Sequence, residues 1–109
     1  MAITINIYYS GKNGNAVKFA EKMISSGIVE AIRQEKGNLR YDYFIPLDDS
    51  GTALLIDSWQ DQAALDAHHR SPLMKKICAL REEYGLHMRV ENYVANESAP
   101  ESDNTFIRE

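Results

Sequence analysis

Alternation of apolar and polar residues predicts a strand at the start of the chain. In residues 2–10 every second side chain is large and apolar, and this row consists of Ile3, Ile5, Ile7 and Tyr9. Successive side chains of a strand point to opposite faces, so the row occupies one face. The other face carries a mixed set, namely Thr4, Asn6 and Tyr8. We therefore expect a strand with one apolar face and one mixed face.

A long helix is expected after a glycine-containing turn. Asn15 can cap its start and Gly37 can stop it, which predicts a helix over residues 15–36. Apolar residues at steps of three or four predict its buried stripe, which is Val17, Ala20, Ile24, Ile28 and Ala31. Gly27 lies at the centre of this predicted helix, where a glycine lowers helix stability by roughly 1 kcal/mol relative to alanine. Close packing on the sheet, which we favour, and a kink that opens a pocket are the two explanations.

Two further strands are predicted to form an antiparallel hairpin. Residues 38–46 are aromatic and alternating, and the turn L-D-D-S-G separates them from residues 52–59. The second segment contains the run Leu54, Leu55 and Ile56 and ends at the only tryptophan, Trp59. A β-favouring apolar run of this length predicts a strand buried on both faces.

The region after Trp59 predicts two short helices and a last strand. Asp61 occupies an N-cap position, and Ser71-Pro72 begins a second helix that Gly85 ends. Residues 86–95 then alternate as a strand. The order β-α-β-β-α-β predicts an α+β ferredoxin-like fold, in which helices cover one side of a four-stranded antiparallel sheet.

Both faces of this sheet carry large side chains, which predicts a second cover. Besides the isoleucine row, Tyr8, Tyr41 and Tyr43 are large residues of the strands. A sheet that is apolar on both sides needs a partner surface. We therefore expect a homodimer that buries sheet against sheet.

The chain divides into a domain, residues 1–96, and a C-terminal tail, residues 97–109. The segment E-S-A-P-E-S-D is polar and contains proline, as linkers do. Phe106 and Ile107 nevertheless lie near the end of the chain. An apolar pair on a tether predicts docking, either on its own domain or at the dimer interface.

Composition narrows the function classes. A net charge of −4 argues against a nucleic-acid-binding surface. The chain shows no secretory signal pattern and no apolar run of about 20 residues, so we expect no membrane association and a cytoplasmic protein. Cys78, the only cysteine, is expected to be a small buried hydrophobe. The three histidines lack partners at ligand spacing, which argues against a metal site.

Two stretches carry a resemblance to a known family. E-K-G-N-L-R-Y-D-Y-F (35–44) and L-I-D-S-W-Q-D-Q-A-A-L-D-A-H-H-R-S-P-L-M (55–74) resemble the antibiotic biosynthesis monooxygenase (ABM) superfamily, in particular its bacterial quinol monooxygenase-like branch. The resemblance covers roughly residues 2–95. It implies a dimeric α/β barrel and oxidation of polycyclic phenols or quinols with O₂ as co-substrate, without metal, flavin or nicotinamide.

The same fold serves other functions, so alternatives stay open. Relatives include haem-degrading proteins, which use an Asn on the first strand, a Trp at the end of the third and a His on the following helices. Asn6, Trp59 and His68 offer these residue types. A haem-binding or haem-degrading protein and a non-catalytic small-ligand-binding dimer are therefore alternatives to a cofactor-independent monooxygenase. An RNA-binding ferredoxin-like domain is disfavoured, because residues 52–59 lack the basic, glycine and aromatic spacing of a base-stacking strand.

An oxygenase without a cofactor needs one base in an apolar, aromatic-lined pocket. His68 is the candidate for this catalytic base, since helical spacing turns it inward and its ordinary pKa of about 6.5 suits proton abstraction near neutrality. A structural core histidine is the alternative. The neighbouring His69 points about 100° further round and is expected in solvent. His87, on the last strand, is expected to be structural.

Four further residues are candidates for substrate binding. Trp59 would form a flat wall for an aromatic ring; the alternative is that it only packs in the core. Asn6 would donate to a substrate oxygen, or bonds within the dimer interface. Tyr41 and Tyr8 are weaker candidates of the same kind. The chain has no G-x-G-x-x-G after a strand and no phosphate loop, so no nucleotide cofactor is expected.

Overall fold

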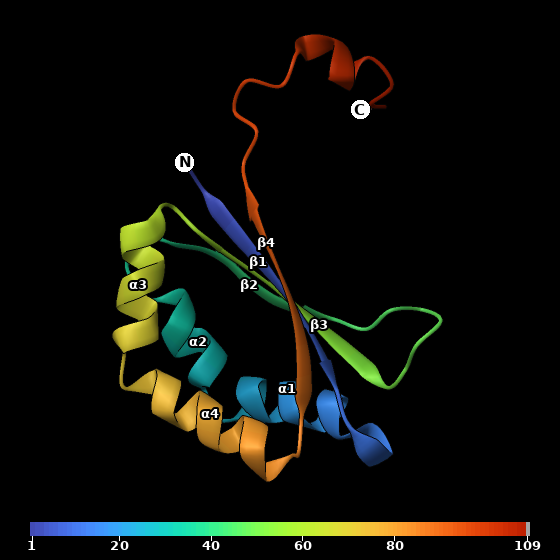
Figure 1. Cartoon of the computed structure of the whole chain (residues 1–109), viewed down its shortest axis with the longest axis vertical. Helices are drawn as coiled ribbons and strands as arrows, with labels where there is room; N and C mark the ends of the chain where they lie inside the picture. Colours follow the sequence, from blue (N-terminus) through green and yellow to red (C-terminus); the bar gives the residue numbers. More distant parts are fainter. Residues whose placement is uncertain (109) are drawn as a thin grey trace.

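The computed structural model describes residues 1–108 and contains one four-stranded antiparallel sheet. The strand order is β2-β3-β1-β4, and the strands are β1 (Ile3–Ser10), β2 (Asn38–Phe44), β3 (Thr52–Trp59) and β4 (His87–Val94). All helices of the domain lie on one side of the sheet (Figure 1), and these are α1 (Asn15–Ser25), α2 (Ile28–Arg33), α3 (Gln62–Arg70) and α4 (Leu73–Glu83). Two short 3-10 helices, Lys12–Gly14 and Glu101–Asn104, complete the described elements. The predicted α+β ferredoxin-like order is confirmed.

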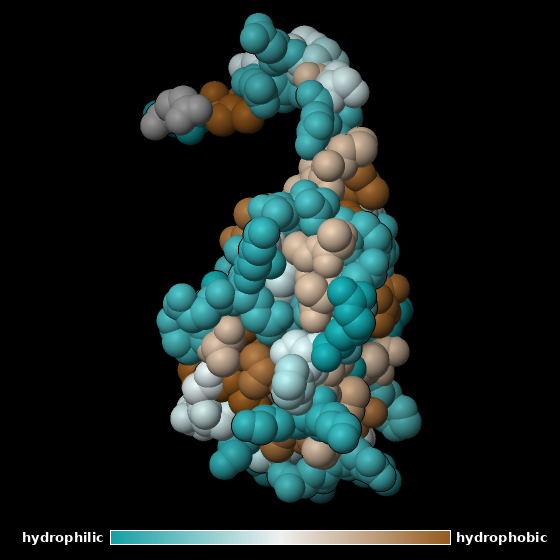
Figure 2. All heavy atoms as spheres, turned by 90° about the vertical axis from the view of Figure 1, so that its left-hand side faces the viewer, coloured by the Kyte–Doolittle hydropathy of each residue, from teal (hydrophilic) through white to brown (hydrophobic). Residues whose placement is uncertain are grey.

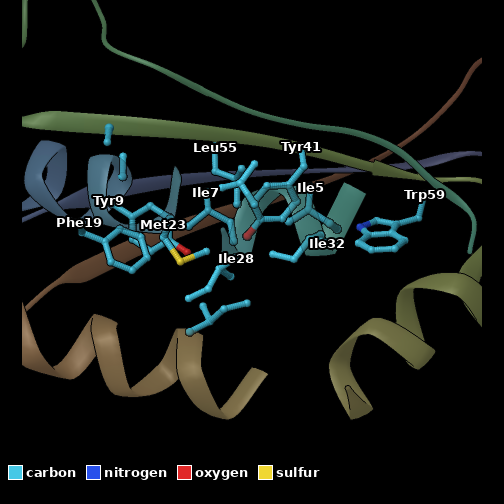
Figure 3. Packing of buried hydrophobic residues seen from close by; sticks show 14 of the residues in the cluster. Ile5, Ile7, Tyr9, Phe19, Met23, Ile28, Ile32, Tyr41, Leu55 and Trp59 are labelled. Carbon is cyan, nitrogen blue, oxygen red and sulfur yellow. The ribbon is translucent and has the colours of Figure 1, made fainter. Parts of the chain in front are cut away.

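The register between β1 and β3 determines which residues form the core. Ile3 lies opposite Trp59, and Ile7 lies opposite Leu55. Directly opposed residues of an antiparallel pair share a face. The helix-facing residues of these two strands are all buried, and they are Ile3, Ile5, Ile7, Tyr9, Ala53, Leu55, Asp57 and Trp59. Figure 3 labels five of them, namely Ile5, Ile7, Tyr9, Leu55 and Trp59.

The prediction that β3 is buried on both faces is wrong. Leu54 and Ile56 point away from the helices and are only partly buried. The run of three apolar residues concealed an ordinary alternation, in which Asp57 belongs to the buried side.

The single helix expected over residues 15–36 is instead two helices. The chain breaks at Gly27, whose φ of +84° places it in the left-handed region. No atom lies within 4 Å of a Cβ built on Gly27, so close packing does not explain this glycine. The predicted stripe is also out of phase before the break, because Met23 is buried and Ile24, on the same helix, is 58% exposed. The residues that are buried on these helices are Ala16, Phe19, Ala20, Met23, Ile28, Val29 and Ile32.

The starts of α3 and α4 are as predicted. The Asp61 carboxylate accepts a hydrogen bond from the Ala64 backbone N–H at 2.9 Å. The Ser71 hydroxyl accepts one from the Leu73 N–H at 3.2 Å. Cys78 is exposed, which corrects the expectation of a buried thiol. Ile77 takes the buried position on α4, and the next residue is turned about 100° away from it.

The tail stands clear of the domain (Figures 1 and 2). Phe106 is 93% exposed and Ile107 is also exposed, so packing of this pair on its own domain is not found. Docking on a partner stays a prediction. Glu109, the last residue of the predicted tail, lies outside the described residues. None of the described helices has the length and apolar character of a membrane span.

Two glycines provide a test of packing between α3 and the start of β2. An added Cβ at Gly37 would lie 2.5 Å from the Ala64 Cβ, and Gly37 has the same φ of +84° as the open Gly27. Gly37→Ala should therefore lower the free energy of unfolding by about 3 kcal/mol, through left-handed strain plus the clash. Gly27→Ala should cost only about 1 kcal/mol, from strain alone. Urea unfolding of both variants measures the difference, and equal losses would contradict the packing.

Candidate functional site

A cavity of about 340 Å³ lies between the helix-facing side of the sheet and helices α3 and α4. About half of its wall residues are aliphatic or methionine, such as Ile5, Leu55 and Leu65, and the other half carry polar groups. Two β4 residues of the wall, Met88 and Val90, are 44% and 52% exposed, so the cavity opens at this edge of the sheet. Its volume is at the small end of the range of cavities that bind small molecules.

His68 is one of the polar groups in this wall. It comes from α3, is buried, and its Nδ1 lies 3.1 Å from both carboxylate oxygens of Glu35. The neutral ring can donate its Nδ1–H to Glu35, which leaves Nε2 as a proton acceptor. Burial lowers the pKa of His68, and the Glu35 hydrogen bond and charge act in the opposite direction. The ring is therefore neutral near pH 7, as a base must be.

Trp59 supports the polar groups from behind the cavity wall. Its indole is fully buried and stacks on the His68 ring, with 4.6 Å between centroids and 26° between planes. Its Nε1–H donates to the Asp57 carboxylate at 2.7 Å. Trp59 is not among the residues that line the cavity, and the arrangement makes it a positioning residue for its two neighbours.

Asp57 is a cavity residue that the sequence reasoning missed. It lies on the helix-facing side of β3 and only 5% of it is exposed. Burial raises its pKa to about 6, although the Trp59 hydrogen bond and the Arg81 charge act to lower it. The available signal was the period of the strand, because Asp57 is two residues before Trp59 and therefore shares its face. Treating β3 as buried on both sides hid this signal.

Arg81, Asn92 and Gln62 are further polar residues of the cavity wall that sequence reasoning did not identify. The Arg81 Nε–H donates to the Tyr9 hydroxyl at 3.1 Å. Burial acts to lower the pKa of Arg81, but interaction with Tyr9 leaves it raised, so the guanidinium is a fixed positive charge beside the cavity. Asn92 is opposite Ile5 in the register and places an amide in the same wall.

The structure brings some of the sequence candidates together and separates others. His68 and Tyr41 line the cavity, with Trp59 behind them. Asn6 and Tyr8 lie on the opposite face of the sheet and do not line this cavity.

Asn6 and Tyr8 have other surroundings on the outer face of the sheet, where Tyr8 borders a separate hollow beside Arg89. The Tyr8 ring lies against the Arg89 guanidinium at 4.0 Å, and the Asn6 Oδ1 is buried without a hydrogen-bond partner among the described residues. His69 is exposed and also lines the cavity, whereas His87 is exposed and does not line it. Within residues 1–108, no group of three His, Cys, Asp or Glu side chains is arranged to hold a metal ion.

The buried carboxyl of Asp57 should reduce stability at neutral pH. Its pKa is raised from 3.8 to about 6, so the fold favours the protonated form, and the stability this form contributes is lost as the pH rises through about 6. The shift corresponds to at most about 3 kcal/mol. Asp57→Asn keeps an acceptor for the Trp59 N–H and should raise the free energy of unfolding by about 1 to 3 kcal/mol at about pH 8.

The pH dependence of this gain is the decisive part of the measurement. Urea unfolding should show the advantage of Asp57→Asn shrinking as the pH falls from about 6 and vanishing only below the ordinary carboxyl pKa of 3.8, where the wild-type carboxyl is protonated in the unfolded state as well as in the fold. A variant that is less stable than wild type at the higher pH would refute the assignment of a destabilising carboxylate.

Comparisons with known proteins agree with this architecture. The solved structures that resemble the chain include an antibiotic biosynthesis monooxygenase, described as putative, from Deinococcus radiodurans (TM-score 0.76, 22% identity, 92% of this chain and 97% of that one). Another, also described as putative, is from Nitrosomonas europaea (TM-score 0.73, 21% identity, 88% and 99% of the two chains). At such identities the likeness shows the shared fold.

Sequence comparison identifies the family. The chain is 30% identical over 59 residues to Putative monooxygenase YcnE of Bacillus subtilis (strain 168), a match covering 54% of this chain and 62% of that protein. The family described as Antibiotic biosynthesis monooxygenase matches residues 2–80. This match extends from β1 into α4 and includes Glu35, Asp57, Trp59 and His68. The chain therefore belongs to the antibiotic biosynthesis monooxygenase family.

Proposed function

We propose that the protein is a cofactor-independent monooxygenase that oxidises small aromatic or quinol substrates with O₂. The observation that carries this proposal is the pairing of buried His68 with the partly buried Glu35, which places a neutral imidazole in the wall of a cavity that also has aliphatic walls. Membership of the family and the relative named as a monooxygenase support the reaction class.

His68 Nε2 removes a proton from the bound phenol or quinol, and Glu35 stabilises the imidazolium that forms. The resulting anion is electron-rich enough to reduce O₂, so the substrate itself supplies the electrons. For a CH₂ group that becomes C=O, one oxygen atom stays on carbon and the other leaves as water. The aliphatic side chains of the wall, such as Ile5 and Leu55, limit the contact of bulk water with the oxygenated intermediate.

The size of the cavity favours this substrate class over haem. A volume of about 340 Å³ accommodates an aromatic molecule of one to three rings. A porphyrin with its propionates would require the space between the sheet and α3 to widen. Closure of that space by the stacked Trp59 and His68 rings argues for the smaller ligand.

We also propose a homodimer that covers the outer face of the sheet. That face carries Leu54, Ile56 and the half-exposed Tyr93, and it contains the unpaired buried Oδ1 of Asn6. An unsatisfied buried acceptor costs about 1 to 3 kcal/mol. A second copy packed on this face would cover the apolar residues and could supply a donor to Asn6.

Oxygen consumption tests the proposed base. With a panel of quinols and anthrone, wild-type protein freed of metals by chelation should consume O₂ above the autoxidation background. His68→Gln should reduce this rate by about 100-fold or more, because the general base is lost. His87→Gln, which changes an exposed histidine on β4, is the matched control and should retain the rate. Undiminished uptake by His68→Gln would remove His68 from the reaction.

Light scattering tests the dimer. The mass in solution should be about twice the 12.4 kDa of one chain. Ile56→Arg places a charge in the proposed interface and should shift the mass toward one chain. Ile24→Arg makes the same change on exposed α1 and should leave the mass unaltered. A wild-type monomer at micromolar concentration would disprove the interface.

A further inference from the structure

Asp57 is a buried ionisable group that the mechanism above does not use. It is the carboxylate in the cavity wall, on the same face of β3 as Leu55 and Trp59. Its Oδ1 accepts the Trp59 N–H, and no described protein group donates to its Oδ2. A carboxyl with one oxygen fixed and the other without a protein donor, in the wall of a cavity, is positioned to bond to a ligand.

The indole of Trp59 contacts both Asp57 and His68 and fixes the position of each side chain relative to the other. Trp59 donates to the carboxylate of Asp57 and stacks on the ring of His68. Both of these side chains line the same cavity, and they come from different elements, β3 and α3. A ligand in this cavity therefore meets two proton-transferring groups.

We propose that Asp57 is a second catalytic residue, which protonates the carbonyl oxygen of a bound aryl ketone while His68 removes a proton from the carbon that becomes part of the enol. The proposal rests on the aromatic ligand of the proposed function, but it concerns proton transfer alone and requires no O₂. It gives the cavity an activity of its own, the exchange of an acidic C–H proton with solvent.

The step balances without a further reactant. His68 Nε2 takes the proton as the C–H bond breaks, and the electron pair of that bond forms the C=C bond of the enol. The carbonyl π electrons move to oxygen, which takes the proton of Asp57. Reversal returns a proton to carbon, so that solvent hydrogen enters the ligand each time the two residues re-equilibrate with water.

The charged and titratable neighbours of Asp57 define the expected pH profile. Arg81 on α4 is a fixed cation, and His69 on α3 lines the same cavity from its exposed side. The tyrosines of β1 and β2 beside the carboxyl have raised pKa values and stay neutral; these are Tyr9, Tyr41 and Tyr43. His68 on α3 must be neutral, which requires a pH above its lowered pKa. Asp57 must be protonated, which is lost as the pH rises through about 6. Exchange should therefore decline above about pH 6 as Asp57 ionises.

Deuterium exchange into anthrone under anaerobic conditions tests this proposal. The full-length protein in D₂O buffer should accelerate deuterium incorporation at the C10 methylene, followed by mass spectrometry. Asp57→Asn should slow the enzymatic exchange by about tenfold or more and remove the decline at alkaline pH. Anthrone binding, followed by quenching of the single tryptophan, should stay within about threefold of wild type, because the Trp59 bond can persist. Asp48→Asn makes the same change on an exposed loop and should behave as wild type.

A second variant covers the case in which Asp57→Asn does not fold. Trp59→Phe removes the donor that lowers the pKa of Asp57, so the alkaline decline of exchange should move to higher pH. A purely structural role of Asp57 would not produce this shift.

Each outcome decides between the two proposals. Wild-type exchange no faster than buffer, or exchange by Asp57→Asn with the rate and pH profile of wild type, would overturn the role of Asp57. Catalysed anaerobic exchange without O₂ uptake in air would support Asp57 and reject the oxygenase reaction. Uptake that is abolished by His68→Gln and unaffected by Asp57→Asn would support the oxygenase and reject Asp57.

Discussion

The register between β1 and β3 is the constraint on which both the core and the cavity depend. It sets Ile5 opposite Asp57 and Ile3 opposite Trp59, on the face that the helices cover. A slip of one residue would move every side chain of the strand to the other face. The apolar row of β1 strongly specifies the register, since a slip would expose it. Asp57 is thereby held in an apolar layer that a carboxylate would not otherwise enter.

Local signals in the sequence were sufficient for the order of elements. Alternation marked β1, and the caps at Asp61 and Ser71 marked α3 and α4. The prediction of one helix over residues 15–36 was wrong because it extended a single helical period through Gly27. At Gly27 the backbone has a left-handed conformation, which ends the helix. The predicted stripe fails on both sides of this break: Ile24 in α1 and Ala31 in α2 are exposed, and Met23 and Ile32 are buried instead.

The site was only partly predictable because its contacts are distant in sequence. The inward direction of His68 followed from helical spacing, but its partner Glu35 is 33 residues away and carries no local mark. Asn6 and Tyr8 were chosen for their residue types on the mixed face of β1, and the structure places the cavity on the other face. Which side of a sheet the helices cover is decided by packing of the whole chain. Strand period alone states only which residues share a side.

Trp59 connects the stability of the domain to the chemistry of the cavity. Core packing alone would be served by phenylalanine, yet the indole N–H is used for a 2.7 Å bond to a carboxylate. Burial raises the pKa of that carboxylate and the bond acts against the rise, so the two effects together place it near 6. Three features of this carboxyl have no evident structural benefit. It is expected to reduce stability at neutral pH, one donor holds it, and it borders a cavity. Proton transfer to a ligand accounts for all three features, because that task needs a carboxyl that can be protonated near neutral pH, that is fixed in position, and that has one oxygen available to the ligand.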